Sequence, residues 1–179
     1  MTRVAAIDCG TNSIRLLVAD GHIDESGRPR LADLTRQMRI VRLGQGVDAR
    51  GYLDPAAIER TVEATVEYQR MIEALGATKT RFVATSATRD ASNSADFVRQ
   101  IKAVIGVEPE VVVGTEEASL SFNGAVSGLG ESVAAPMLVV DIGGGSTELV
   151  LGATRVEQAI SIDMGAVRVT EKFLADVDP

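Results

Sequence analysis

Two short segments of the sequence each combine an aspartate, a turn of small residues and a serine. The first is residues 5–13 (AAIDCGTNS) and the second is residues 138–146 (LVVDIGGGS). When Asp8 is aligned with Asp141, a glycine and a serine coincide as well, and an apolar run follows each serine at the same distance. Backbone N–H groups in turns without side-chain bulk can converge on a phosphate oxygen. The repetition predicts an internal duplication with two facing anion sites.

The second segment carries the stronger signal for phosphate binding. Its three successive glycines, residues 143–145, remove every Cβ from the turn, and Ser146 adds a hydroxyl donor. A Walker loop or a dinucleotide-binding fingerprint would enter a helix here, whereas the apolar residues 149–151 predict a returning strand. A plain flexible turn between two strands is the alternative. The flanking acids favour a phosphate-binding hairpin.

Three carboxylates lie beside these turns. Asp8 and Asp141 end the two strands, where each could face a bound phosphate, and Glu148 lies on the second returning strand. Acids around a phosphate are most simply explained by Mg²⁺, which prefers oxygen ligands and offsets the repulsion between the acids and the phosphate. For Asp8 alone, a turn-forming role is the alternative. We predict that all three bind the metal.

Two further segments stand where a strand is expected to give way to a helix. In residues 114–118 (GTEEA) the two acids could simply complement the helix dipole, or one of them could deprotonate the attacking water in phosphoanhydride hydrolysis. In residues 85–93 (TSATRDASN) we expect a loop in which Ser92 or Asn93 caps the next helix and Arg89 binds phosphate. For each segment, the structural role and the functional role both stay open from the residues alone.

The elements that must position these residues follow an α/β pattern. Asp54 and Pro55 predict a helix start, and apolar residues at helical spacing continue to Gly76. A polar turn is expected at residues 21–29, with His22 inert in it, and Cys9 is expected to pack within its strand. The remaining expected elements are strands at 4–9, 13–20, 31–42, 81–85 and 110–113, helices at 94–105 and 116–126, a loose stretch at 127–136, strands at 137–141, 146–152 and 155–162, and a helix from Gly165.

Composition narrows the class of protein. The 179 residues have a formal net charge of −7, which argues against nucleic-acid and anionic-membrane binding, since such binding depends on a basic surface. A single cysteine excludes an intrachain disulfide, and no apolar run is long enough for a signal peptide or a membrane span. We therefore expect a cytoplasmic protein in which arginines line a local basic cleft.

Together these segments, with residues 164–171 (MGAVRVTE), resemble the exopolyphosphatase and guanosine pentaphosphate phosphohydrolase family. The resemblance implies the fold of the actin-like ATPase superfamily. A first ribonuclease-H-like lobe of order β-β-β-α-β-α-β-α would span residues 1–128, and residues 129–179 would begin a similar, incomplete second lobe. It further implies Mg²⁺-assisted release of terminal phosphate from inorganic polyphosphate or guanosine pentaphosphate.

The resemblance also implies roles for individual residues. Glu117, rather than Glu116, would be the catalytic base, and Glu148 would orient the water while binding metal with Asp141 and Asp8. The residues implied to bind substrate phosphate are Asn12, Ser13, Arg89, Gly143, Gly144, Gly145 and Ser146.

Two other functions share this fold. One is an acetate- or sugar-kinase-like phosphotransferase, and the other is a non-enzymatic, actin-like nucleotide-binding protein; the paired acids favour hydrolysis over both. Family members continue beyond residue 179, so we expect part of a longer protein with weak activity on its own. Exposed strand edges lead us to expect a homodimer.

Overall fold

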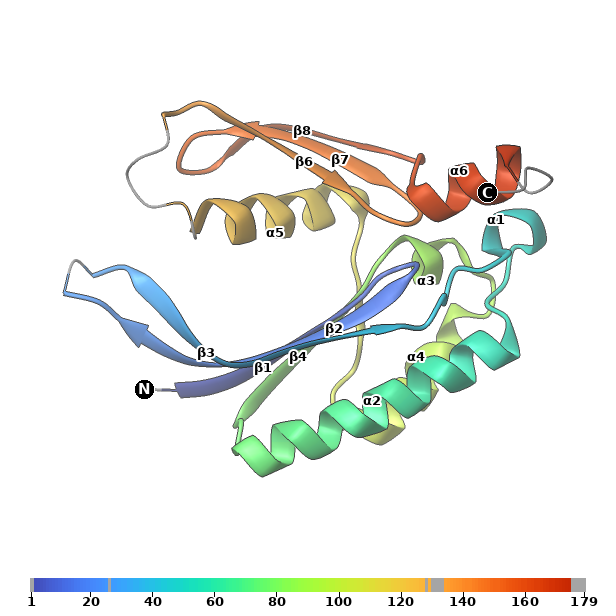
Figure 1. Ribbon diagram of the computed structural model, residues 1–179, viewed down its shortest axis with the longest axis horizontal. Helices are drawn as coiled ribbons and strands as arrows, with labels where there is room; N and C mark the ends of the chain where they lie inside the picture. Colours follow the sequence, from blue (N-terminus) through green and yellow to red (C-terminus); the bar gives the residue numbers. More distant parts are fainter. Residues whose placement is uncertain (1, 26, 128, 130–133, 175–179) are drawn as a thin grey trace.

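The chain forms two β-sheets with helices between and below them (Figure 1). The computed structural model describes residues 2–25, 27–127, 129 and 134–174. A five-stranded sheet has the order β3-β2-β1-β4-β5, and a three-stranded sheet has the order β6-β7-β8. The predicted α/β class is therefore confirmed. The strands also follow one another along the chain as predicted. Within the described residues, no helix combines the length and the apolar character needed to cross a membrane.

The first sheet has the mixed pairing of a ribonuclease-H-like lobe. Strands β1 to β3 form an antiparallel meander, and β4 and β5 add in parallel on the other side of β1. The meander is longer than predicted because the pairing of β2 with β3 continues through His22. This residue lies on β2 and faces Arg30 of β3. The expectation that His22 lies in a polar turn was therefore wrong. The strands are β1 (Thr2–Cys9), β2 (Ser13–Ile23), β3 (Pro29–Ile40), β4 (Lys79–Ala84) and β5 (Glu110–Val111).

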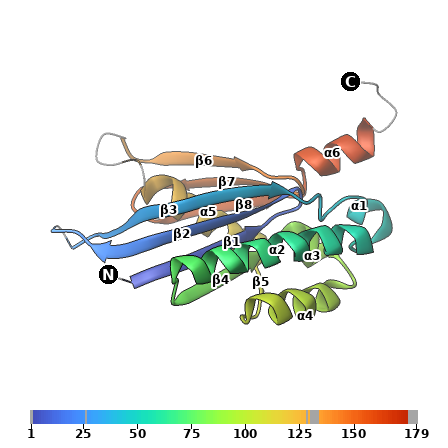
Figure 2. The ribbon, with the colours of Figure 1, turned by 60° about the horizontal axis from the view of Figure 1, so that its bottom comes forward.

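Helices α2 (Pro55–Leu75) and α4 (Ser94–Ile105) cover one face of this sheet (Figure 2). The start of α2 follows its predicted signals, since the Asp54 side chain accepts a hydrogen bond from the Ala56 N–H at 2.9 Å. The core beneath the helices contains Phe82, Phe97 and Tyr68, whose hydroxyl donates to the Ile14 carbonyl at 3.0 Å. Cys9 is buried in this core, as expected of a packed strand residue.

Two short helices escaped prediction. Helix α1 (Val47–Arg50) follows β3, and α3 (Ser86–Asp90) occupies the stretch expected to be a loop. Asn93 precedes α4 but does not cap it through its side chain, which instead accepts from the Leu53 N–H at 2.8 Å and donates to the Leu53 carbonyl at 3.0 Å. Asn93 therefore stands at the predicted N-cap position, but its side chain makes no capping bond because this amide ties two loops together.

The second sheet is covered by α5 (Gly114–Ser127), which lies between the two sheets (Figure 1). Ala118 and Phe122 of α5 are fully buried against Val150 of β7. Residue 128, at the predicted lobe boundary, and part of the predicted loose stretch lie outside the described residues, so the boundary stays a prediction. The remaining elements are β6 (Met137–Ile142), β7 (Thr147–Gly152), β8 (Val156–Ile162) and α6 (Ala166–Phe173).

Candidate phosphate-binding cleft

The two glycine-containing turns have the same backbone geometry. In the β1–β2 turn the Gly10 N–H donates to the Ser13 carbonyl at 2.9 Å, and in the β6–β7 turn the Gly143 N–H donates to the Ser146 carbonyl at 2.9 Å. Asp8 and Asp141 occupy equivalent positions, because each belongs to the second pair of facing residues counted from its turn. The duplication expected from the sequence is thus present in the backbone.

Residues of both turns line a cavity of about 220 Å³, and most of the predicted site residues line it too. The structure also brings in residues that the sequence did not single out, among them Thr11, Thr85 and Ser86. Arg89 and Gly145 do not line this cavity. The predicted site residues that line it are Asp8, Asn12, Ser13, Glu117, Asp141, Gly143, Gly144, Ser146 and Glu148.

The glycines of the second turn allow it to lie directly against the first. A Cβ on Gly144 would stand 2.9 Å from Cβ of Thr11, and a Cβ on Gly145 would stand 2.6 Å from Oγ of Ser86. The Thr11 and Ser86 hydroxyls share a buried hydrogen bond of 2.8 Å. Gly145 is therefore required for packing between the turns, and a contact of Gly145 with phosphate stays a prediction.

Helix α6 holds the second turn from behind. The Ala166 N–H donates to the Gly143 carbonyl and the Val167 N–H to the Gly144 carbonyl, both at 2.9 Å. Because N–H and C=O point in opposite directions across a peptide plane, the N–H groups of Gly144 and Gly145 point away from α6. In the part of the chain that the structure describes, these two N–H groups have no acceptor. They are available to bind an anion.

Two carboxyl groups at the cavity, Glu117 and Asp8, have raised pKa values. The pKa of Glu117 is raised from 4.5 to about 7, chiefly by burial and then by the Glu148 carboxylate, while a hydrogen bond from Arg89 acts against the shift. The pKa of Asp8 is also raised by burial, and Asp141 adds to this shift whereas Arg15 opposes it. A carboxyl with a pKa near neutrality can accept a proton from water and release it again.

Hydroxyl groups fix the two acids of the second hairpin. The Ser121 hydroxyl donates to Asp141 at 2.6 Å, and the Ser161 hydroxyl donates to Glu148 at 2.8 Å. Glu148 is only 1% exposed. Within the described residues, no Lys or Arg lies within ion-pair distance of either acid, and no three His, Cys, Asp or Glu side chains are grouped closely enough to hold a metal by themselves.

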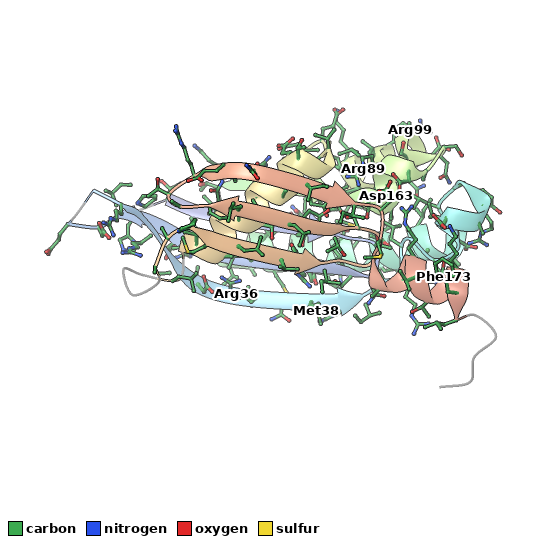
Figure 3. All side chains as sticks on the ribbon, turned by 90° about the horizontal axis from the view of Figure 1, so that it is seen from above. Arg36, Met38, Arg89, Arg99, Asp163 and Phe173 are labelled. Atoms are coloured by element: carbon green, nitrogen blue, oxygen red, sulfur yellow. The ribbon has the colours of Figure 1, made fainter. Side chains whose placement is uncertain are left out.

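The neighbouring acids Glu116 and Glu117 point to different places. Glu117 lines the cavity, whereas Glu116 lies 3.3 Å from the Arg81 guanidinium. Arg89, labelled in Figure 3, donates to the Val112 carbonyl at 2.9 Å and lies 3.4 Å from the Glu117 carboxylate. In this arrangement Arg89 contacts the candidate base, and its predicted contact with phosphate stays a prediction.

A second, larger cavity of about 820 Å³ adjoins the first and shares Asp8, Arg15 and Glu117 with it. Its lining adds two arginines, Arg36 and Arg81, to Arg15. Arg36 and Met38 lie along β3, on the same strand (Figure 3). Arginines line this cavity as expected, but Asp8, Glu117 and Asp141 line it as well, so its lining is of mixed charge.

Residues 21–179 of this chain match the sequence pattern of the Ppx/GppA phosphatase family. The chain belongs to this family. It is 50% identical to Exopolyphosphatase 2 of Mycobacterium tuberculosis, over the whole chain and 57% of that protein. The fold of the actin-like ATPase superfamily, which the resemblance implied, is likewise confirmed.

Solved structures of family members superimpose closely on the chain. The crystal structure of an exopolyphosphatase-like protein, 46% identical, has a TM-score of 0.90 and is matched by 98% of this chain over 54% of its own length. The Ppx/GppA family member of Aquifex aeolicus, 34% identical, has a TM-score of 0.78, with 96% of this chain and 54% of that one covered. The chain thus spans little more than half the length of these proteins.

The residues that sequence reasoning missed in this family member lack a strong local signal. Thr11 lies inside the first predicted turn, and Ser86 lies in the hydroxyl-rich stretch before Arg89, but their pairing joins positions 75 residues apart. Only the packing of α3 against the first turn shows that these hydroxyls meet at the cavity.

Proposed function

We propose that the chain contains the catalytic cleft of an exopolyphosphatase, in which Glu117 deprotonates the water that attacks the terminal phosphate of polyphosphate. One observation carries this proposal: Glu117, with a pKa near 7, faces the cavity between two phosphate-binding turns. A base is most effective when its pKa lies close to the working pH. The names of the relatives support polyphosphate as the substrate.

Phosphate would be bound mainly by the backbone of the second turn. The N–H groups of Gly144 and Gly145 are directed away from α6, and Gly144, Ser13 and Ser146 line the small cavity. Such preorganised donors stabilise the negative charge on a transferring phosphoryl group. The arginines of the larger cavity would attract the rest of the polyanion.

Mg²⁺ fits the donor set of this cleft. Asp8, Asp141 and Glu148 line the cavity and would hold it. Burial, with a smaller contribution from Asp141, raises the pKa of Asp8 despite the neighbouring Arg15, and a cation would offset this cost of burying the carboxylate. Mg²⁺ in phosphoryl-transfer sites is usually bound by one or two carboxylates together with substrate phosphates and water, so a cage made of protein alone is not required. When bound, the ion would polarise a phosphoryl oxygen and neutralise developing charge.

Guanosine pentaphosphate is the second candidate substrate. Its terminal phosphoanhydride presents the same chemistry to the small cavity, and the purine would need the larger cavity, whose lining includes the apolar residues Leu17, Met38 and Leu120. Polyphosphate stays the first choice because three arginines share that lining. Discrimination would depend on the larger cavity rather than on the turns.

The test is phosphate release from long-chain polyphosphate with Mg²⁺, measured for the 179-residue chain and for a chimera. In the chimera, the chain replaces the matching part of the mycobacterial relative. Glu117→Gln should lower kcat roughly 10³-fold, because a positioned base contributes 10²- to 10⁴-fold. Glu116→Gln should lower kcat less than about fivefold, because a lost surface ion pair costs about 1 kcal/mol at most.

Each alternative outcome has a defined meaning. Equal losses in the two Gln variants would contradict the assignment of the base to Glu117. Phosphate release from guanosine pentaphosphate but not from polyphosphate would mean that guanosine pentaphosphate, rather than polyphosphate, is the substrate. ATP-dependent phosphorylation of acetate or a sugar would indicate a kinase, and nucleotide binding without any phosphate release would indicate a binding protein.

A further inference from the structure

Helix α6 reaches across to the first lobe at two points. Most of the helix lies within residues 164–171 (MGAVRVTE), a segment that resembles the family. So far this segment has been given no role in the cleft beyond its backbone bonds to the glycine turn. Arg168 and Glu171 lie on this helix, and both contact residues near α1 and α3 (Figure 1). The contacts join segments about 80 to 125 residues apart.

The Arg168 guanidinium bridges two carboxylates of the first lobe. Its Nη1 lies 2.9 Å from Oδ1 of Asp48, and its Nη2 lies 2.6 Å from Oδ2 of Asp90. The Arg168 side chain is 20% exposed, so solvent weakens these contacts less than those of a typical surface pair. The planar guanidinium can hold both partners at fixed angles, which an ammonium group cannot do.

A second contact reinforces the first. The Glu171 carboxylate accepts from the Gly46 N–H, at 3.2 Å for Oε1 and 3.0 Å for Oε2. Gly46 precedes α1, and the Gly44 N–H two residues earlier donates to the Thr11 carbonyl at 2.8 Å. Glu171 therefore ties α6 to the same loop that holds the first phosphate-binding turn.

The ionic contacts continue to the candidate base. Asp90 lies 3.7 Å from Nε of Arg89, and Nη1 of Arg89 lies 3.4 Å from the Glu117 carboxylate. A continuous series of charged groups thus runs from Asp48 through Arg168 and Asp90 to Arg89 and Glu117. Arg168 also connects this series to the glycine turn, because the backbone of its helix, α6, donates hydrogen bonds to the carbonyls of Gly143 and Gly144.

We propose that Arg168 is a positioning residue, which fixes the glycine turn of the second lobe and the Arg89–Glu117 pair at one spacing by bridging Asp48 and Asp90. The role in turnover rests on the proposed function. A shift of α6 would carry Gly143 and Gly144 with it, because their carbonyls accept hydrogen bonds from its first turn. The same shift would move Arg168 away from Asp90. Displacements of about 1 Å in a site of this kind can lower rates about 10²-fold.

The first experiment measures hydrogen exchange in the 179-residue chain for Arg168→Met and for Arg99→Met. Arg99 is a matched control, because it makes a surface ion pair with Asp96 on α4 and lies far from Phe173 of α6 (Figure 3). Loss of a local anchor opens a segment preferentially. We expect exchange of the hydrogen-bonded amides of Gly143 and of residues 166–169 to rise about tenfold in Arg168→Met only.

The second experiment separates geometry from charge in the chimera. Arg168→Met should lower kcat roughly 10- to 100-fold with KM changed less than about threefold, and Arg168→Lys should recover little, because a lysine cannot bridge both carboxylates. Asp48→Asn combined with Arg168→Met should cost no more than Arg168→Met alone, since both changes break one contact.

The outcomes distinguish this proposal from the proposed function. Unchanged exchange in Arg168→Met would overturn the positioning role whatever the activity. Faster exchange with unchanged kcat, or full recovery of kcat in Arg168→Lys, would also overturn it. If no form releases phosphate, the proposed function fails, while faster exchange in Arg168→Met alone would still support the anchoring of the glycine turn.

Discussion

The two glycine-containing hairpins have the same turn geometry and differ in the residue paired with the aspartate. Across the strand pair from Asp8 stands Arg15, whose side chain is 63% exposed, whereas across from Asp141 stands Glu148, which is buried. Arg15 opposes the rise in the pKa of its neighbour Asp8, and Glu148 raises that of Glu117. Under the proposed function, the repeated turn would supply a common means of binding phosphate, and the acid that replaces an arginine in the second hairpin would adjust the pKa of Glu117 on α5.

The sharpest way to break this comparison is to neutralise each of the two residues in turn. Glu148→Gln should lower kcat about 10²- to 10³-fold, a loss typical of a group that stabilises or orients the reacting atoms. Arg15→Gln should lower kcat/KM only a few fold, because Arg15 acts on the polyanion from an exposed position. Steady-state phosphate release in the chimera measures both, and similar losses would show that the hairpins do not divide their roles.

The second prediction concerns stability against pH. Because the pKa of Glu117 is raised to about 7 in the folded chain, its proton stabilises the fold fully below pH 4.5, and that contribution is lost as the pH rises through 7. The loss is roughly 3 kcal/mol at most. Urea unfolding at pH 4.5, 6 and 8 should show the slope in the wild-type chain.

Two variants test the origin of that slope. Glu117→Gln should remove most of it, and Glu148→Gln should reduce it, because one of the two carboxylates that raise the pKa of Glu117 is gone. Arg15→Gln is the matched change in the first hairpin and should leave the slope between pH 6 and 8 unaltered. A slope that survives in Glu117→Gln would point to another group.

The third prediction compares the two glycine turns. Gly144→Ala should destabilise the fold by about 1 to 3 kcal/mol, because the new methyl group would stand 2.9 Å from Cβ of Thr11. Gly10→Ala should cost less than about 0.5 kcal/mol, since its nearest neighbour, the Ser13 carbonyl, would be 3.5 Å away. Equal losses in denaturant unfolding would mean that the turns are not packed as described.

The smallest expected effect belongs to the hydroxyl pair. Ser86→Ala removes the buried partner of Thr11 and should destabilise the fold by about 1 kcal/mol. Ser127→Ala is a suitable control, because that hydroxyl bonds an exposed carbonyl within its own helix. Thermal unfolding should separate the two variants, and no difference would show that the Thr11 hydroxyl finds another partner.

Local patterns allowed much of this fold to be predicted. Asp54, Pro55 and Gly76 are sufficient to bound α2, and the repeated Asp-to-Ser spacing is sufficient to place both hairpins. The short α3 could not be predicted, because its five residues contain two threonine or serine hydroxyls and no apolar period. Side-chain orientation was also beyond the sequence, since the turn of Arg89 toward Glu117 depends on how α5 leaves β5.

That exit of α5 couples the charge of the candidate base to the motion of the lobes. The helix starts at the edge of the first sheet, yet its apolar face packs on the second sheet. If the cleft opened, Glu117 would travel with Glu148 and leave both Asp8 and Arg89 behind. Its pKa would then lose the small increase caused by Asp8 and also the larger decrease caused by the hydrogen bond from Arg89. The proton affinity of the candidate base therefore depends on how closely the two sheets approach each other.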